Sequence, residues 1–207
     1  MEQRSDEWYA ARCGSLGASQ LNDALATTKT GWGASRENLK NKIIAERLTG
    51  VPAESYTNAA MLWGIDNEDA ARQAYEAHTG TFVDELGIAY HPVLKHTHAS
   101  PDGLVGNDGL IEIKCPNTTT HIETLRSGKA PSKYIKQMQW QMRCVDRQWC
   151  DFVSFDPRLP KHLQLFIVRV DRDDEFISKL DTQVAEFLSE VEREIEELNE
   201  RFSNDTE

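Results

Sequence analysis

The sequence of 207 residues has no long apolar run and little cysteine or histidine. No run of about eighteen apolar residues occurs, which argues against a helical membrane span. A secretion signal begins with basic residues followed by an apolar run, whereas the first residues here carry charges of both signs and no apolar run follows them. The four cysteines show no Cys-x-x-Cys spacing, which argues against a zinc site or a disulfide framework. The six histidines suggest no metal triad. We expect a soluble, cytoplasmic protein with reduced thiols and no membrane partner.

An excess of basic residues is also missing, because the net charge is −11. This balance argues against a protein that coats nucleic acid without discrimination. Residues 171–207 hold fourteen acids and four bases, net −10, which leaves −1 for residues 1–170. A near-neutral body can still present a basic groove.

Hydrophobic periodicity and capping residues predict an α/β chain that forms one domain over residues 1–207. We expect a mobile loop at 27–34 and short strands within 81–91. Longer strands are expected at 149–155 and 163–170. Helices are expected at 5–13, from 18–19, at 35–50 with Ser35 as cap, 57–78, 118–126, 132–145 with Ser132 as cap, and 173–202. This order favours a central mixed β-sheet flanked by helices.

The most informative pattern is Ser100-Pro101-Asp102-Gly103 followed by Glu112-Ile113-Lys114. Asp108-Gly109 between the two apolar halves predicts a β-hairpin. Glu112 and Lys114 then share one face, Ile111 and Ile113 share the other, and Asp102 lies beside them. Two carboxylates and an ammonium group suit a Mg²⁺ site completed by water. A solvated hairpin with an exposed Glu/Lys pair is the simpler alternative.

The complete pattern Pro-Asp-x9-Glu-x-Lys resembles the PD-(D/E)XK nuclease superfamily. It is most similar to the phage exonucleases of the lambda exonuclease and YqaJ-like viral recombinase type. The same resemblance extends over Trp8 to Arg12, Gly17-Ala18-Ser19, Trp63-Gly64 with Glu68, Tyr134 with Gln137, and Phe155-Asp156-Pro157-Arg158.

The resemblance implies a restriction-endonuclease-like fold and assigns roles to individual residues. Asp102, Glu112 and the carbonyl of Ile113 would bind metal, and Lys114 would position water or stabilise developing charge. Glu68 would complete the acidic cluster, directly or through water. Two further residues, Gln137 and Tyr134, would line the active site.

The resemblance also implies residues that bind DNA. Arg12 and Ser19, at a predicted helix N-terminus, would hold a terminal 5′-phosphate. Met61 would separate the strands, or else pack in a core. Lys29 and Arg36 would contact the DNA backbone, although residues 26–36 depart most from the family pattern.

We therefore expect a Mg²⁺-dependent, ATP-independent 5′→3′ exonuclease with one or two ions, for which Mn²⁺ can substitute. It would degrade linear duplex DNA to mononucleotides, leave a 3′ strand for recombination, form a homotrimeric ring and work with a single-strand annealing protein. The alternatives are an endonuclease of the same superfamily and an inactive DNA-binding scaffold. The final amphipathic helix either packs on the body or offers a partner face.

Overall fold

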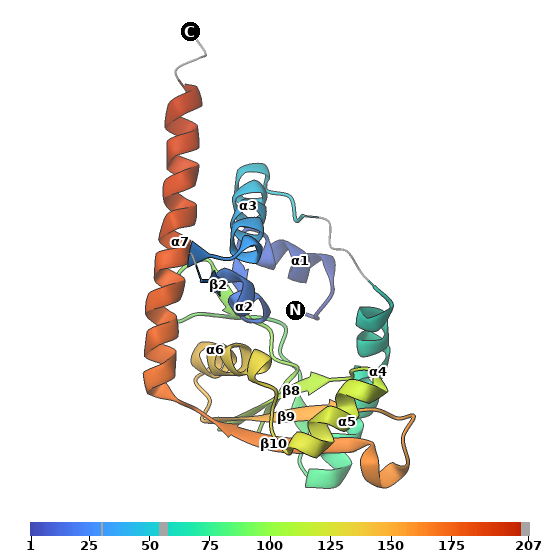
Figure 1. Cartoon of the computed structure of the whole chain (residues 1–207). Coiled ribbons are helices and arrows are strands. Elements are labelled where there is room, and N and C mark those ends of the chain that lie inside the picture. The colour runs from blue at the N-terminus through green and yellow to red at the C-terminus, as the bar shows by residue number, and fades with distance from the viewer. Residues whose placement is uncertain (30, 54–57, 204–207) are drawn as a thin grey trace.

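The computed structural model describes residues 1–29, 31–53 and 58–203. Its centre is a five-stranded mixed sheet in the order β10-β9-β8-β7-β4 (Figure 1). The pair β8–β9 is parallel and the other neighbours are antiparallel. The strands are β4 (Val83–Asp84), β7 (Gly103–Val105), β8 (Gly109–Lys114), β9 (Trp149–Phe155) and β10 (Leu165–Asp171). The predicted central mixed sheet is confirmed.

Helices cover both faces of this sheet, as expected. On one face, Tyr75 of α4 (Ala59–Thr79) packs with Ile111 and Ile113 of β8. On the other face, Met138 of α6 (Ile135–Val145) packs with Leu110. Helix α5 (Thr118–Ser127) lies against β9.

A second, smaller group of elements stands beside the sheet (Figure 1). It contains a three-stranded sheet in the order β1-β6-β5 and the antiparallel pair β2–β3. The elements of this group are α1 (Asp6–Arg12), β1 (Leu16–Gly17), η1 (Ala18–Gln20), α2 (Leu21–Ala24), β2 (Thr27–Thr28), β3 (Gly31–Trp32), α3 (Ala34–Thr49), β5 (Ala89–Tyr90) and β6 (Thr97–Ala99).

The long helix α7 (Asp174–Ser203) packs against α3 and α6 and extends past the other elements at its C-terminal end (Figure 1). Its apolar stripe is buried from Ile177 to Val191, whereas Leu198 and Phe202 are exposed. The prediction that the final helix packs on the body of the protein is therefore confirmed for most of its length.

Several local expectations need correction. Gly33, not Ser35, is the N-cap of α3. Segment 27–34, expected as a mobile loop, contains the strands β2 and β3, which pair antiparallel. Ser132 lies inside a 3₁₀ turn, η2 (Ser132–Tyr134), and makes no cap hydrogen bond. Another 3₁₀ turn, η3 (Lys161–Leu163), delays the last strand to Leu165.

Other expectations about helix ends and cysteines agree with the structure. Ser5 caps α1, and Gly50 and Gly80 end α3 and α4 in left-handed conformations. The predicted start of α4 at residue 57 lies outside the described residues. All four cysteines are free, and Cys115 and Cys150 are buried. No helix within the described residues combines the length and hydropathy of a membrane span.

Candidate active site

The predicted hairpin exists, but its turn differs from the expected one. Strands β7 and β8 pair with Gly103 opposite Ile111 and Val105 opposite Gly109, which leaves a loop of residues 106–108. Gly106 (φ +54°) is the left-handed residue of this loop. Gly109 is required for another reason, because a Cβ there would lie 2.1 Å from the Trp149 ring.

The hairpin brings the three motif residues together. Asp102 accepts a 2.6 Å hydrogen bond from the backbone N–H of Ile113. Glu112 is fully buried on the sheet face that α6 covers, and Lys114 forms an ion pair with it. Asp102 therefore lies beside the Glu-x-Lys strand, as predicted.

Two amides of α6 hold the Glu112 carboxylate. The side-chain N–H groups of Gln137 and Gln141 donate to its two oxygens, each at 2.6 Å. Gln137 was a predicted site residue, whereas Gln141 was not, although its i,i+4 spacing places it on the same face. The ring of Tyr134 lies 5.2 Å from the Lys114 ammonium group.

The local charges determine the protonation of Lys114 and Asp102. Burial raises the pKa of Asp102 well above its ordinary value, and repulsion from Glu112 adds to this effect. Burial alone would lower the pKa of Lys114, but the carboxylates of Glu112 and Asp102 outweigh it and raise this pKa. Without a bound metal, Lys114 is therefore a cationic hydrogen-bond donor at neutral pH.

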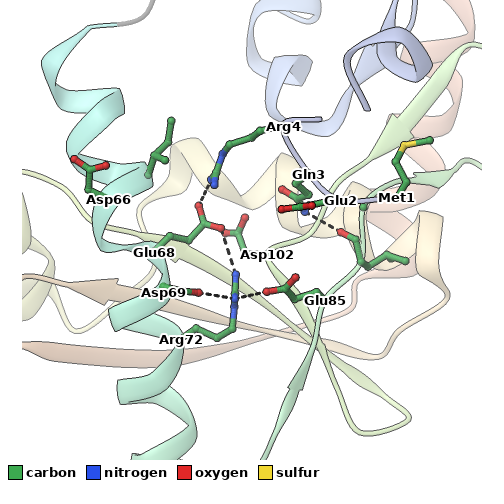
Figure 2. A pocket seen from close by; sticks show the side chains of 13 residues that line it. Met1, Glu2, Gln3, Arg4, Asp66, Glu68, Asp69, Arg72, Glu85 and Asp102 are labelled. Atoms are coloured by element: carbon green, nitrogen blue, oxygen red, sulfur yellow. Dashed lines mark hydrogen bonds and ion pairs between the residues drawn. The ribbon is translucent and has the colours of Figure 1, made fainter. Parts of the chain in front are cut away.

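Glu68, from α4, lies next to Asp102, and so joins the acidic cluster as predicted (Figure 2). Two cations hold it: Arg4 forms one ion pair, and Arg72 forms another at 3.5 Å. Neither arginine was expected at the site. Arg4 follows no recognisable motif, and Arg72 is one of several charged residues on its helix.

A metal site was predicted from Asp102, Glu112, Glu68 and the Ile113 carbonyl. Within the described ranges, no group of three His, Cys, Asp or Glu side chains is arranged to hold a metal ion. The donor set nevertheless suits a hard cation, because all of its ligand atoms are oxygens of carboxylates and of one backbone carbonyl. Water and the backbone carbonyl would have to complete the coordination.

A cavity of about 670 Å³ connects the cluster with two predicted DNA-binding residues. Its lining includes Glu68, Asp102 and Lys114 together with Ser19 and Met61. Met61 is 49% exposed, so the alternative in which it packs in a core is wrong. The neighbouring Leu62 and Ile65 are exposed too, which makes this turn of α4 an apolar rim.

Arg12 lies in a distinct environment beside this cavity. Its guanidinium stacks 3.9 Å from the Trp8 ring and donates at 3.1 Å to the hydroxyl of Ser100. Burial lowers its pKa to about 10, so the group stays charged at neutral pH. Among the described residues it forms no ion pair, although the Glu46 carboxylate lines the same cavity and acts on its charge. A half-buried cation without an ion-pair partner is suited to an external anion.

The structure changes the predicted composition of this anion site. The described contacts of Arg12 place Ser100, and not Ser19, beside it. Ser19 sits in the single turn η1, and α2 has four residues, so a helix dipole contributes little there. His98 borders the same cavity as Arg12, is fully buried, and has Nδ1 2.8 Å from the Ser15 hydroxyl.

The two backbone-contact predictions have different outcomes. Lys29 is exposed, so the structure leaves it accessible. Arg36 is 1% exposed, forms a two-pronged ion pair with Glu190 at 2.9 and 3.2 Å, and stacks 4.0 Å from Trp32. This burial opposes the predicted contact with DNA, because that pair would have to open first.

The chain is similar in sequence and in structure to known exonucleases. Residues 7–148 match the family model of the YqaJ-like viral recombinase domain. Two crystal structures of an alkaline exonuclease from Laribacter hongkongensis, one of them in complex with dAMP, are 50% identical to this chain. They cover 97% of this chain and 99% of their own, with TM-scores of 0.91 and 0.90. A phage-related exonuclease from Haemophilus somnus is 17% identical over 89% of this chain and 96% of its own, with a TM-score of 0.70, and shares the fold. No curated protein matches the sequence.

Proposed function

The chain belongs to the YqaJ-like viral recombinase family and is a DNA nuclease, and we propose that it is a Mg²⁺-dependent, ATP-independent 5′→3′ exonuclease. It degrades one strand of linear duplex DNA to mononucleotides and leaves a 3′ strand for annealing. The observation that carries the proposal is the cluster of Asp102, Glu112 and Lys114, in a fold that matches an alkaline exonuclease over nearly its whole length. The structure of that relative with dAMP supports a nucleoside monophosphate as the product.

The roles of the site residues follow from their surroundings. A bound divalent metal would activate water and neutralise charge on the departing oxygen. Asp102 and Glu112, with Glu68 and the Ile113 carbonyl, would hold it. The two glutamines keep the Glu112 carboxylate fixed. Because Lys114 is cationic, it donates to the phosphate oxygens or to the attacking water instead of acting as a base.

The 5′ polarity is supported by the anion site around Arg12. A terminal phosphate would receive charge-assisted hydrogen bonds from Arg12 and a hydrogen bond from the hydroxyl of Ser100, whereas Ser19 lines the adjoining cavity. Met61 on the apolar rim would separate the 5′ strand from its complement, at the modest cost of unstacking one base step. The first nucleotide would then lie between this anion site and the acidic cluster.

Product analysis tests the proposal against its alternatives. The purified chain is incubated with Mg²⁺ and end-labelled linear duplex, covalently closed circles serve as the control substrate, and ATP is omitted. Mononucleotides from the linear duplex and intact circles are expected. Cut circles would indicate an endonuclease, and binding without any cleavage would indicate an inactive scaffold.

We further propose that the protein is cytoplasmic. We also propose a single-strand annealing protein as its partner, because a 3′ strand must be coated soon after it forms. Direct docking would raise the concentration of that protein at the emerging strand. The excess of acidic residues in 171–207 suits a basic partner by charge. A pull-down at low salt, with and without DNA, tests the interaction, and no binding in either condition removes it.

A further inference from the structure

Arg4 lies where three cavities meet. It lines the acidic cavity with Glu68 and Asp102 (Figure 2). It also lines the active-site cavity with Lys114 and the cavity that contains Arg12. Arg4 therefore stands between the cluster proposed to cut DNA and the site proposed to hold its 5′-phosphate.

The neighbours of Arg4 fix its backbone on both sides. Gln3 donates hydrogen bonds to the carbonyls of Leu86 and Pro101 at 2.8 and 2.9 Å, and Pro101 directly precedes Asp102. Ser5 caps α1, the helix that carries Arg12. The position of Arg4 is thus set by the two parts of the site that it separates.

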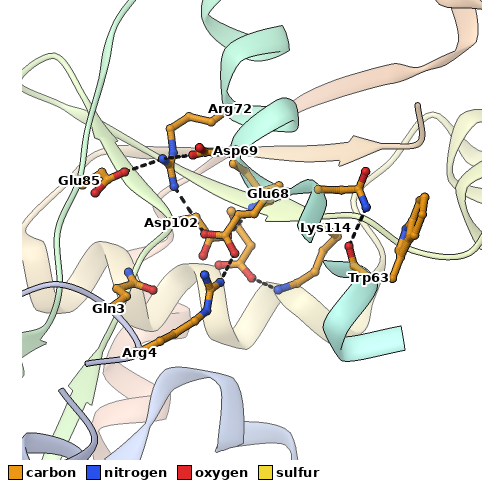
Figure 3. Close-up of polar contacts among 12 residues, drawn as sticks. Gln3, Arg4, Trp63, Glu68, Asp69, Arg72, Glu85, Asp102 and Lys114 are labelled. Carbon is orange, nitrogen blue, oxygen red and sulfur yellow. Dashed lines mark hydrogen bonds and ion pairs between the residues drawn. The ribbon is translucent and has the colours of Figure 1, made fainter. Parts of the chain in front are cut away.

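Arg4 also has a backbone conformation that is rare for a residue with a side chain. Its φ of +69° lies in the left-handed region, which costs energy for any residue other than glycine. This conformation directs the guanidinium towards Glu68 (Figure 3). Strained residues that the surrounding structure holds in place are concentrated at functional sites.

The two cations on Glu68 differ in how firmly they are held. Arg72 is mostly buried and also contacts Asp69 and Glu85, at 2.9 and 2.6 Å. Arg4 is 39% exposed at its side chain and, within the described part of the chain, pairs with Glu68 alone. Arg4 is therefore the cation that can leave Glu68 at little cost.

We infer that Arg4 is a catalytic phosphate-binding residue, which Glu68 holds in the free protein and which moves to the phosphate at the cleavage position when DNA binds. The inference rests on the proposed nuclease function. In the free protein Arg4 donates to one carboxylate oxygen of Glu68. A guanidinium group can donate to a phosphate oxygen in the same way, and can bind two of them, so the exchange loses no hydrogen bond. The move removes one of the two cations that Glu68 contacts and leaves only Arg72, so Glu68 can bind the divalent metal more readily. Metal and DNA therefore favour each other's binding.

The first measurement is metal affinity without DNA. Isothermal titration calorimetry with Mg²⁺, repeated with Mn²⁺, compares the wild-type chain with Arg4→Gly, which removes the guanidinium and suits the left-handed backbone. The variant should bind metal about 3- to 10-fold more tightly, because Glu68 loses a competing cation. An unchanged or weaker affinity overturns the exchange with Glu68.

The second measurement is the interaction with DNA. The variant should bind a 5′-phosphorylated duplex roughly 5- to 20-fold more weakly in EDTA, by fluorescence anisotropy, and lose about 10- to 100-fold in kcat/KM with Mg²⁺, since a charge-assisted bond is missing. DNA affinity and cleavage within 2-fold of wild type would make Arg4 a mere counterion of Glu68 and overturn the inference.

Two further variants complete the design. Arg4→Lys keeps the charge without the two-pronged geometry and should recover part of the DNA affinity. Arg126→Ala removes an exposed arginine of α5 and should change none of these values by more than about 2-fold. A wild-type chain that cuts no linear duplex refutes the proposed function, whereas the metal and anisotropy measurements still decide the role of Arg4.

Discussion

Lys114 is the residue on which the proposed chemistry depends most directly. It remains cationic beside two carboxylates, and no other lysine is among the residues that line the active-site cavity. Lys114→Ala should lower kcat by about 10²- to 10³-fold, because the variant loses a charge that stabilises the transition state. DNA and metal binding should largely survive, and Lys129→Ala, at an exposed position, serves as the control. Cleavage within a few-fold of wild type would refute the assigned role.

Arg12 determines the preference for a phosphorylated end, if the 5′-phosphate assignment is correct. Arg12→Ala should reduce the ratio of rates on 5′-phosphate and 5′-hydroxyl ends by about 10- to 150-fold, the range of a charge-assisted hydrogen bond worth 1.5–3 kcal/mol. Both substrates are measured with both proteins. Equal rates of the wild-type protein on the two ends would show that the pocket is misplaced.

The residues of the motif could be predicted from the sequence, but many of their partners could not. Asp102, Glu112 and Lys114 have a fixed spacing on one hairpin, and strand alternation places them together. Ser100 is part of the motif, but its hydrogen bond from Arg12 joins distant segments. Arg4 reaches the site through such contacts too, namely the bonds of Gln3 to Leu86 and Pro101. No local pattern records such contacts, because neither spacing nor propensity depends on them.

At the scale of elements, the turn after β9 is held by a buried carboxylate. Asp156 accepts hydrogen bonds from Arg158 and Thr118, which outweigh the opposing effect of burial and lower its pKa from 3.8 to about 2. A lowered pKa stabilises the fold above pH 3.8, and this contribution is lost as pH falls towards 2. Urea unfolding should show a loss of roughly 2 kcal/mol over this range in the wild type.

Asp156→Asn is the corresponding variant, since the amide cannot titrate. It should be less stable at neutral pH by about 2 kcal/mol and should lose less stability between pH 4 and 2 than the wild type. The same acid dependence in both proteins would mean that another group controls it.

The attachment of α7 depends on a buried ion pair with α3. Glu190→Gln leaves the buried guanidinium of Arg36 without its counterion and should lower the free energy of unfolding by roughly 2–4 kcal/mol. This range is below the cost of breaking a fully buried ion pair, because the side chain of Glu190 is 25% exposed. Lys179→Ala breaks the exposed pair with Glu175 on the same helix and should cost at most about 0.5 kcal/mol. Equal effects of the two variants would contradict a structural role for Arg36.

Element types were easier to predict than their ends. Apolar stripes identified α3 and α7, because burial of one face dominates their energy. The pair β2–β3 and the 3₁₀ turns η2 and η3 have two or three residues each, so tertiary contacts decide their conformation. Ser35 and Ser132 are good capping residues by type, but Gly33 and Pro131 precede them and start the turns instead.

At the scale of the molecule, the remaining prediction concerns assembly. The resemblance to ring-forming exonucleases predicts a homotrimer, and exposed apolar side chains such as Phe82, which is 86% exposed, are compatible with a further interface. Light scattering should give about three times the chain mass of 23.5 kDa. A ring that encloses the duplex would keep the enzyme on its substrate by topology, so one binding event should yield many mononucleotides even when excess competitor DNA is added after binding. The two measurements must agree. A protein that stays monomeric over the assayed concentrations and still degrades DNA processively would refute the ring. Its processivity would then have to come from tight contacts with the DNA phosphates, and the processivity would depend strongly on salt.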